Sequence, residues 1–204
     1  MNEIPTIGRT SDKVVQHAIE TVYRGYEFRS RLEAKWAAFF DLCDWTWAYE
    51  PVDLNGWIPD FALGEHPVYV EVKPFFENAE WDDQLRDIER AKPDHAVVCL
   101  GADATWWSKT DLESPQIGWI IESLDDLNYV EALHFGISEG NGKLGLYPPD
   151  GTWQNAIWKF SGEHTHKQSR VELSKDEVEF LLVRAWARAC NISKWIPLRK
   201  DSNK

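Results

Sequence analysis

The sequence predicts an α/β protein whose core follows the order helix, three strands, helix, strand around a mixed sheet. A helical apolar stripe at 30–43 forms the first helix, and aromatic or alternating runs form strands at 45–51, 56–63 and 68–73. An amphipathic segment at 80–92 then leads into an apolar run at 95–100. Strand, helix and strand in succession imply a right-handed crossover, so the strands on either side of the second helix are expected to be parallel.

The first core helix is predicted from Ser30 to Cys43. Its apolar residues recur at helical spacing and form one buried stripe of Leu32, Trp36, Phe39, Phe40 and Cys43. Ser30 and Glu33 match the Ser-x-x-Glu capping box, in which both residues close the first turn. Ahead of this helix, 11–22 is predicted as a short helix and 23–28 as a linker rich in aromatic residues.

The second and third strands flank a turn-like Gly-Glu-His-Pro sequence and are expected to pair as a hairpin. Side chains alternate between the two faces of a strand, so Glu71 and Lys73 share the face opposite the valines. Asp60 shares its face with Ile58 and Ala62, and pairing brings Asp60 close to Glu71 and Lys73. Two carboxylates and an ammonium group on one face are typical of a metal and phosphate site. The structural alternative is a solvated ion pair, which contributes only about 0–1 kcal/mol.

At these residues the chain resembles the PD-(D/E)XK nuclease superfamily. The signature of that superfamily is Pro-Asp followed, on the next strand, by Asp/Glu-x-Lys. The matching residues here are Pro59-Asp60 and Glu71-Val72-Lys73. The stretch 23–74 also looks like small phage and mobile-element endonucleases, including junction-resolving and transposon end-cleaving enzymes. The resemblance covers 20–101 and implies a restriction-endonuclease-like fold.

The resemblance implies a metal-dependent nuclease that hydrolyses DNA phosphodiester bonds with Mg²⁺ or Mn²⁺. Asp60, Glu71 and the carbonyl of Val72 are then expected to hold the ion, because hard cations prefer oxygen ligands. Lys73 is expected to orient the attacking water or to stabilise charge on the phosphate. Glu33 matches a further acidic position on the first core helix of the superfamily and is expected to join the catalytic and metal shell. Capping of the helix is the alternative role for Glu33.

Several polar side chains are candidate contacts to nucleic acid. They are Arg24, Arg29, Arg31, Gln84, Arg184 and Arg188. For each arginine the alternative is an ordinary solvated charge. Gln84 does not complete the Gln-x-x-x-Tyr motif of some superfamily members, because Ile88 stands at the fourth position after it.

The formal net charge of −12 argues at first against a nucleic-acid partner. The acidic excess is confined to 37–158, which carries 23 acidic and six basic side chains, whereas both ends of the chain are net basic. The acidic middle contains the candidate metal ligands. The charge distribution therefore permits phosphate contacts at the basic ends.

Composition indicates a cytoplasmic protein. Cys43, Cys99 and Cys190 are odd in number and far apart, which is typical of reduced thiols rather than of a disulfide framework. No apolar run approaches the ~18–20 residues of a membrane span, and the N-terminus lacks the regions of a secretory signal. DNA is the expected partner and a membrane is not. A homodimer or a complex with a recombination or replication protein is also compatible with this interpretation.

The C-terminal half, 102–204, is predicted as a Trp-rich β elaboration packed on the 1–101 nuclease core in one compact domain. Strands are expected at 117–121, 129–137 and 144–147, and a helix at 174–190 with its apolar stripe on Val178, Leu181, Leu182, Ala185, Trp186 and Ala189. The tryptophans favour core packing over base stacking, and His164 and His166 favour a polar loop over a metal pair. A binding or assembly subunit without catalytic activity is the alternative function.

Overall fold

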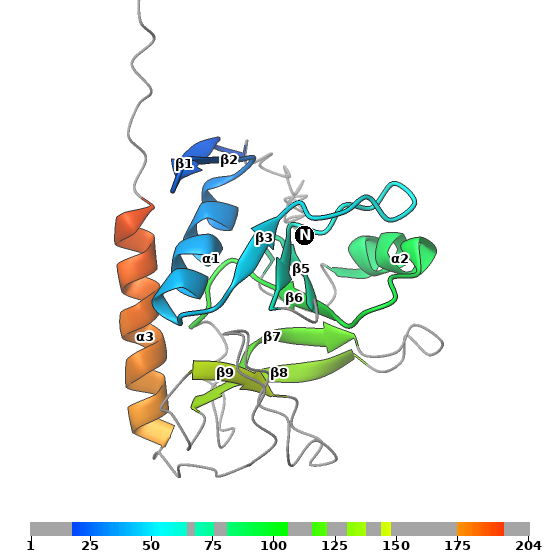
Figure 1. Cartoon of the computed structure of the whole chain (residues 1–204). Coiled ribbons are helices and arrows are strands. Elements are labelled where there is room, and N and C mark those ends of the chain that lie inside the picture. Colours follow the sequence, from blue (N-terminus) through cyan, green and yellow to red (C-terminus); the bar gives the residue numbers. More distant parts are fainter. Residues whose placement is uncertain are drawn as a thin grey trace, which may run out of the picture.

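The computed structural model describes residues 18–64, 68–75, 81–105, 116–121, 130–137, 144–147 and 175–193. These residues form a mixed α/β fold, as predicted, with helices on both faces of one sheet (Figure 1). The helices are α1 (Arg31–Leu42), α2 (Asp82–Ala91) and α3 (Lys175–Ile192). The sheet runs in the order β3 (Trp47–Tyr49), β4 (Phe61–Leu63), β5 (Val68–Val72), β6 (Val97–Leu100), β7 (Gln116–Ile121), β8 (Val130–Ile137) and β9 (Leu144–Tyr147).

The pairing of strands confirms that the strands before and after the second core helix are parallel. Strands β5 and β6 are parallel and are joined through α2, whereas every other neighbouring pair in this sheet is antiparallel. The order α1-β3-β4-β5-α2-β6 is the one that the periodicity predicts. Strands β7 to β9 extend the same sheet beyond residue 101, so the first half of the chain and the segment that follows it share one sheet.

Helix α1 forms where the spacing of its apolar residues and its capping residue predict a helix. Ser30 adopts an extended conformation before the first turn, and its hydroxyl oxygen accepts a hydrogen bond from the Glu33 N–H at 3.1 Å. The predicted stripe, apart from the partly buried Leu32, is buried against the sheet and against α3, where the Trp36 and Trp186 rings lie 4.6 Å apart between centroids. The N-terminal end of α1 is thereby held beside β3 and the β4–β5 hairpin, where the candidate site lies.

The two faces of β5 enter different cores, as the alternation of its residues predicts. Val68, Val70 and Val72 pack in the cluster on the α1 side. Tyr69 packs on the other side, against a cluster that includes Ile88 of α2. Glu71, two residues after Tyr69, therefore points to the α2 side at the end of the strand.

The prediction for the N-terminal segment is wrong where the structure describes it. Residues 18–28 hold no helix or linker but a hairpin of β1 (Thr21–Tyr23) and β2 (Tyr26–Phe28). Arg24 and Gly25 form its two-residue turn with φ values of 49° and 84°. A two-residue hairpin turn with positive φ at both positions favours glycine, so the Arg-Gly pair between aromatic residues was the signal for this hairpin.

The helix predicted near the C-terminus is confirmed as α3, with one difference in its apolar stripe. Leu182, Trp186 and Ala189 are buried, but Leu181 is exposed. Adjacent helical residues point about 100° apart, so Leu181 lies outside the stripe of Leu182. None of the three helices in the described part of the chain is long and apolar enough to cross a membrane.

Several predicted features lie outside the described residues. They are residues 11–17, the tail from Arg199, and the side chains of Trp106, Trp107, Trp153, Trp158, His164, His166, Ser174 and Val178. Trp119 lies on β7 and packs, half-buried, against the core on the α2 side. Cys43, Cys99 and Cys190 are free thiols, as expected.

Candidate active site and metal centre

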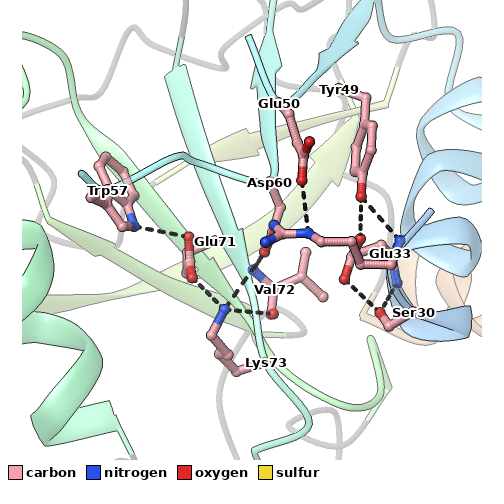
Figure 2. Close-up of polar contacts among 10 residues, drawn as sticks. Ser30, Glu33, Tyr49, Glu50, Trp57, Asp60, Glu71, Val72 and Lys73 are labelled. Carbon is pink, nitrogen blue, oxygen red and sulfur yellow. Dashed lines mark hydrogen bonds and ion pairs between the residues drawn. The ribbon is translucent and has the colours of Figure 1, made fainter. Parts of the chain in front are cut away.

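The β4–β5 hairpin brings Asp60 and Glu71 together. Phe61 pairs with Val70, so the next antiparallel pair beyond the end of β4 is Asp60 with Glu71. The expected approach of Lys73 is confirmed, since its Nζ lies 3.8 Å from Asp60 Oδ2 and forms an ion pair with Glu71 Oε1 (Figure 2). The predicted strand at 56–63 is confirmed only at Phe61–Leu63, since the chain bends at Asp60 and the exposed Ile58 precedes the strand.

Hydrogen bonds hold both carboxylates in place. Asp60 is 1% exposed, and its Oδ2 accepts the Val72 N–H at 2.7 Å. Glu71 is 3% exposed, and its Oε2 accepts the indole N–H of Trp57 at 3.1 Å. The structure therefore rejects the solvated ion pair as the explanation for Glu71 and Lys73.

Burial sets the electrostatics of this pair. Burial and, after it, the Glu71 carboxylate raise the pKa of Asp60 to about 7 against the opposing effect of Lys73. Burial also raises the pKa of Glu71, although Lys73 acts in the opposite direction. Burial alone would lower the pKa of Lys73, but Asp60 and Glu71 outweigh it and raise that pKa, so Lys73 remains protonated at neutral pH. A further cation beside these carboxylates would oppose the effect of burial and favour their ionised forms.

Glu33 lies at the start of α1 and is held by two hydroxyl groups. Its Oε1 accepts a hydrogen bond from Ser30 Oγ at 2.7 Å, and its Oε2 accepts one from the Tyr49 hydroxyl at 2.6 Å. Burial and the hydrogen bond to Glu33 raise the pKa of Tyr49 to about 12. The Glu33 charge also raises the pKa of Asp60, which places the two within electrostatic range. Glu33 thus combines a position in the capped first turn with a carboxylate near the site.

The six candidate nucleic-acid contacts are spread over the molecule. Arg29 lies in the site, with Nη2 2.8 Å from Asp60 Oδ1 and Nε 2.7 Å from Glu50 Oε1. Arg24 pairs instead with Asp41 at 2.7 Å. The others are Arg31 at the start of α1, Gln84 half-buried on α2, and Arg184 and Arg188 exposed on α3. Of the six, Arg29 is the one that forms an ion pair with a candidate metal ligand, Asp60.

Sequence reasoning missed two residues that contact the site. Trp57 lies in the turn before β4, where strand alternation would place it on the face opposite Asp60, yet its indole N–H donates to Glu71. Glu50 directly follows β3, and its backbone N–H donates to the Asp60 carbonyl at 3.0 Å. That ladder contact brings the Glu50 carboxylate to Arg29.

The donor set of the site suits a hard cation. Within the described residues, no group of three or more His, Cys, Asp and Glu side chains is arranged to hold a metal ion. Mg²⁺, however, is commonly bound by one or two carboxylates together with waters and substrate phosphates. Asp60 and Glu71 form such a pair, and the Val72 carbonyl lies beside them, 3.4 Å from Lys73 Nζ. These oxygens fit Mg²⁺ or Mn²⁺ with a partly hydrated shell.

Comparisons with protein-family models, with curated proteins and with solved structures found no match to this chain.

Proposed function

We propose that this chain is a metal-dependent nuclease with a restriction-endonuclease-like core that hydrolyses DNA phosphodiester bonds. One observation carries the proposal, namely two buried carboxylates on paired strands with Lys73 bonded to Glu71 and 3.8 Å from Asp60. The order α1-β3-β4-β5-α2-β6, with β5 and β6 parallel, supports the same core. The Pro-Asp and Glu-x-Lys pattern resembles that of the PD-(D/E)XK nucleases and indicates phosphodiester hydrolysis as the reaction.

The charges around the site support a divalent cation. When every group is ionised, the site holds four carboxylates and two cationic side chains. The carboxylates are Glu33, Glu50, Asp60 and Glu71, and the cations are Arg29 and Lys73. The excess of two negative charges equals the charge of one Mg²⁺ or Mn²⁺ ion. Asp60, Glu71 and the Val72 carbonyl would hold that ion, which when bound supplies Lewis-acid activation of the phosphate and of water.

The remaining residues orient the ligands and the substrate. The Val72 N–H fixes Asp60 and the Trp57 indole fixes Glu71. Lys73 remains protonated, so it stabilises negative charge on the phosphate rather than acting as a base. Glu33 steadies this shell from the first turn of α1.

Cleavage of plasmid, single-stranded and branched DNA in Mg²⁺, Mn²⁺ or EDTA tests the proposal. Cleavage should require metal, and Asp60→Asn, Glu71→Gln and Lys73→Ala should each lower it at least ~100-fold, the effect of losing one electrostatic stabiliser. Asp83→Asn is the control, because that carboxylate is 96% exposed on α2. Undiminished cleavage by a folded Asp60→Asn protein would contradict the proposal.

The second candidate is a DNA-binding or assembly subunit on the same fold, which the net charge of −12 favours over a stand-alone nuclease. It predicts no cleavage in any of these metals. It also predicts function as a homodimer or together with a recombination or replication protein.

A further inference from the structure

The guanidinium of Arg29 lies directly on a candidate metal ligand. Its Nη2 is 2.8 Å from Asp60 Oδ1 and its Nε is 2.7 Å from Glu50 Oε1. The Arg29 side chain is 58% exposed, whereas that of Asp60 is 2% exposed. Arg29 is therefore a cation at the solvent-facing side of a buried carboxylate.

We propose that Arg29 exchanges partners when the metal binds. In the metal-free protein it pairs with Asp60. Once a divalent cation binds there, Arg29 leaves Asp60 Oδ1, stays on Glu50 through Nε, and presents its Nη groups to a DNA phosphate. This inference rests on the proposed nuclease function, and it makes Glu50 a positioning residue for Arg29.

The two oxygens of Asp60 differ in a way that favours this exchange. Oδ2 accepts the Val72 N–H, which belongs to the sheet and cannot move away. Oδ1 is held by Arg29, a long and largely exposed side chain that can move. A guanidinium and a divalent cation at one carboxylate repel each other, so binding of the ion weakens the Arg29 contact.

The backbone and the second partner of Arg29 limit how far it moves. The backbone N–H of Arg29 donates to the Tyr49 hydroxyl at 3.1 Å, and the Tyr49 hydroxyl in turn donates to Glu33. The main chain is thus tied to β3 and α1 while the side chain remains free to turn. While Nε of Arg29 stays paired with Glu50, its two Nη groups are available for a phosphate. A planar guanidinium group binds phosphate in a bidentate manner.

Opposite effects of one substitution on two ligands test the exchange. Arg29→Ala should tighten Mn²⁺ binding about tenfold in calorimetry without DNA. The substitution removes a cation that competes with the metal for Asp60, and this change in affinity corresponds to one charge-assisted hydrogen bond. The same change should weaken binding of a short DNA duplex about tenfold, measured with Mn²⁺ in a Lys73→Ala background to suppress cleavage. Arg86→Ala removes another exposed arginine, from α2, and should change neither affinity.

Two further variants separate the exchange from a change in fold or in overall charge. Arg29→Lys keeps the charge and should leave Mn²⁺ affinity near that of the natural protein while still weakening DNA binding. Glu50→Gln should weaken DNA binding without tightening Mn²⁺ binding, because the anchor of Arg29 is lost and the competing cation remains.

The outcomes distinguish failure of the exchange from failure of the proposed function. If the natural protein binds Mn²⁺ and Asp60→Asn does not, but Arg29→Ala leaves either affinity unchanged, the exchange is wrong and the metal site stands. If the natural protein binds no Mn²⁺, both proposals are wrong. Tighter Mn²⁺ and weaker DNA binding in Arg29→Ala, with Arg86→Ala unchanged, support the exchange.

Discussion

Replacing Asp60 with asparagine should make the metal-free protein more stable at pH 8. Asp60 is almost completely buried and lies opposite Glu71, and its pKa is raised from the ordinary 3.8 to about 7. Asparagine resembles the protonated carboxyl group in shape and cannot ionise. The substitution therefore removes the charge that burial and Glu71 disfavour, while its amide oxygen can still accept the Val72 N–H.

The size and sign of the effect follow from the pKa of Asp60. At about 1.4 kcal/mol per pKa unit, a rise from 3.8 to about 7 means that ionised Asp60 opposes folding by up to about 4 kcal/mol. The folded carboxyl group binds its proton more tightly than the unfolded one. Its contribution to the free energy of unfolding is therefore fully present below pH 4 and is lost as the pH rises through 7.

Thermal melts in EDTA between pH 4 and pH 8.5 measure this effect. At pH 8, Asp60→Asn should melt at least about 4 °C higher than the natural protein, since ~1 kcal/mol shifts Tm by ~2–4 °C at this chain length. The difference should vanish near pH 4. Millimolar Mn²⁺ should raise the Tm of the natural protein at pH 8 and leave that of Asp60→Asn nearly unchanged.

A matched control removes a carboxylate outside the site. Asp41 accepts hydrogen bonds from Tyr23, Arg24 and Trp47, so Asp41→Asn should lower Tm at pH 8. If Asp60→Asn also lowers Tm at pH 8, or melts with the same pH dependence as the natural protein, the electrostatic reasoning is refuted. An equal Mn²⁺ shift in both proteins would exclude Asp60 as a ligand.

Three other substitutions test separate parts of the structure. Glu33→Gln should lower the Tm by ~2–4 °C, which corresponds to about 1 kcal/mol of stability. It should reduce the cleavage rate by no more than about tenfold. A ~100-fold loss of cleavage with an unchanged Tm would instead make Glu33 a metal ligand. Trp57→Phe should weaken Mn²⁺ binding about tenfold in calorimetry by removing the donor to Glu71, while Trp47→Phe, outside the site, should not. Gly118→Ala should destabilise by about 1–3 kcal/mol in urea unfolding, because its Cβ would lie 2.4 Å from a β6 carbonyl oxygen; unchanged stability would contradict the β6–β7 register.

Local periodicity predicted the elements that build the site. The stripe of α1, the alternation of β5 and the succession of β5, α2 and β6 each depend on residues close together in the sequence. For the same reason the pairing of Asp60 with Glu71 was predictable, because a short hairpin leaves few registers that bury the valines. The errors lie where local signals compete. The hairpin of β1 and β2 was mistaken for a helix followed by a linker, although its Arg-Gly turn carries the positive φ values.

The sequence by itself determined the α/β class, the faces of the β4–β5 hairpin and the presence of Asp60, Glu71 and Lys73 in one place. Only the tertiary structure decided how their charges are arranged. Arg29 reaches Asp60 from the loop before α1, Glu50 at the end of β3 pairs with Arg29, and Trp57 reaches Glu71 from the turn before β4. No repeating pattern encodes those contacts, because they depend on how separate segments pack and on the burial that their packing creates. That burial, which the sequence pattern does not specify, raises the pKa of both Asp60 and Glu71.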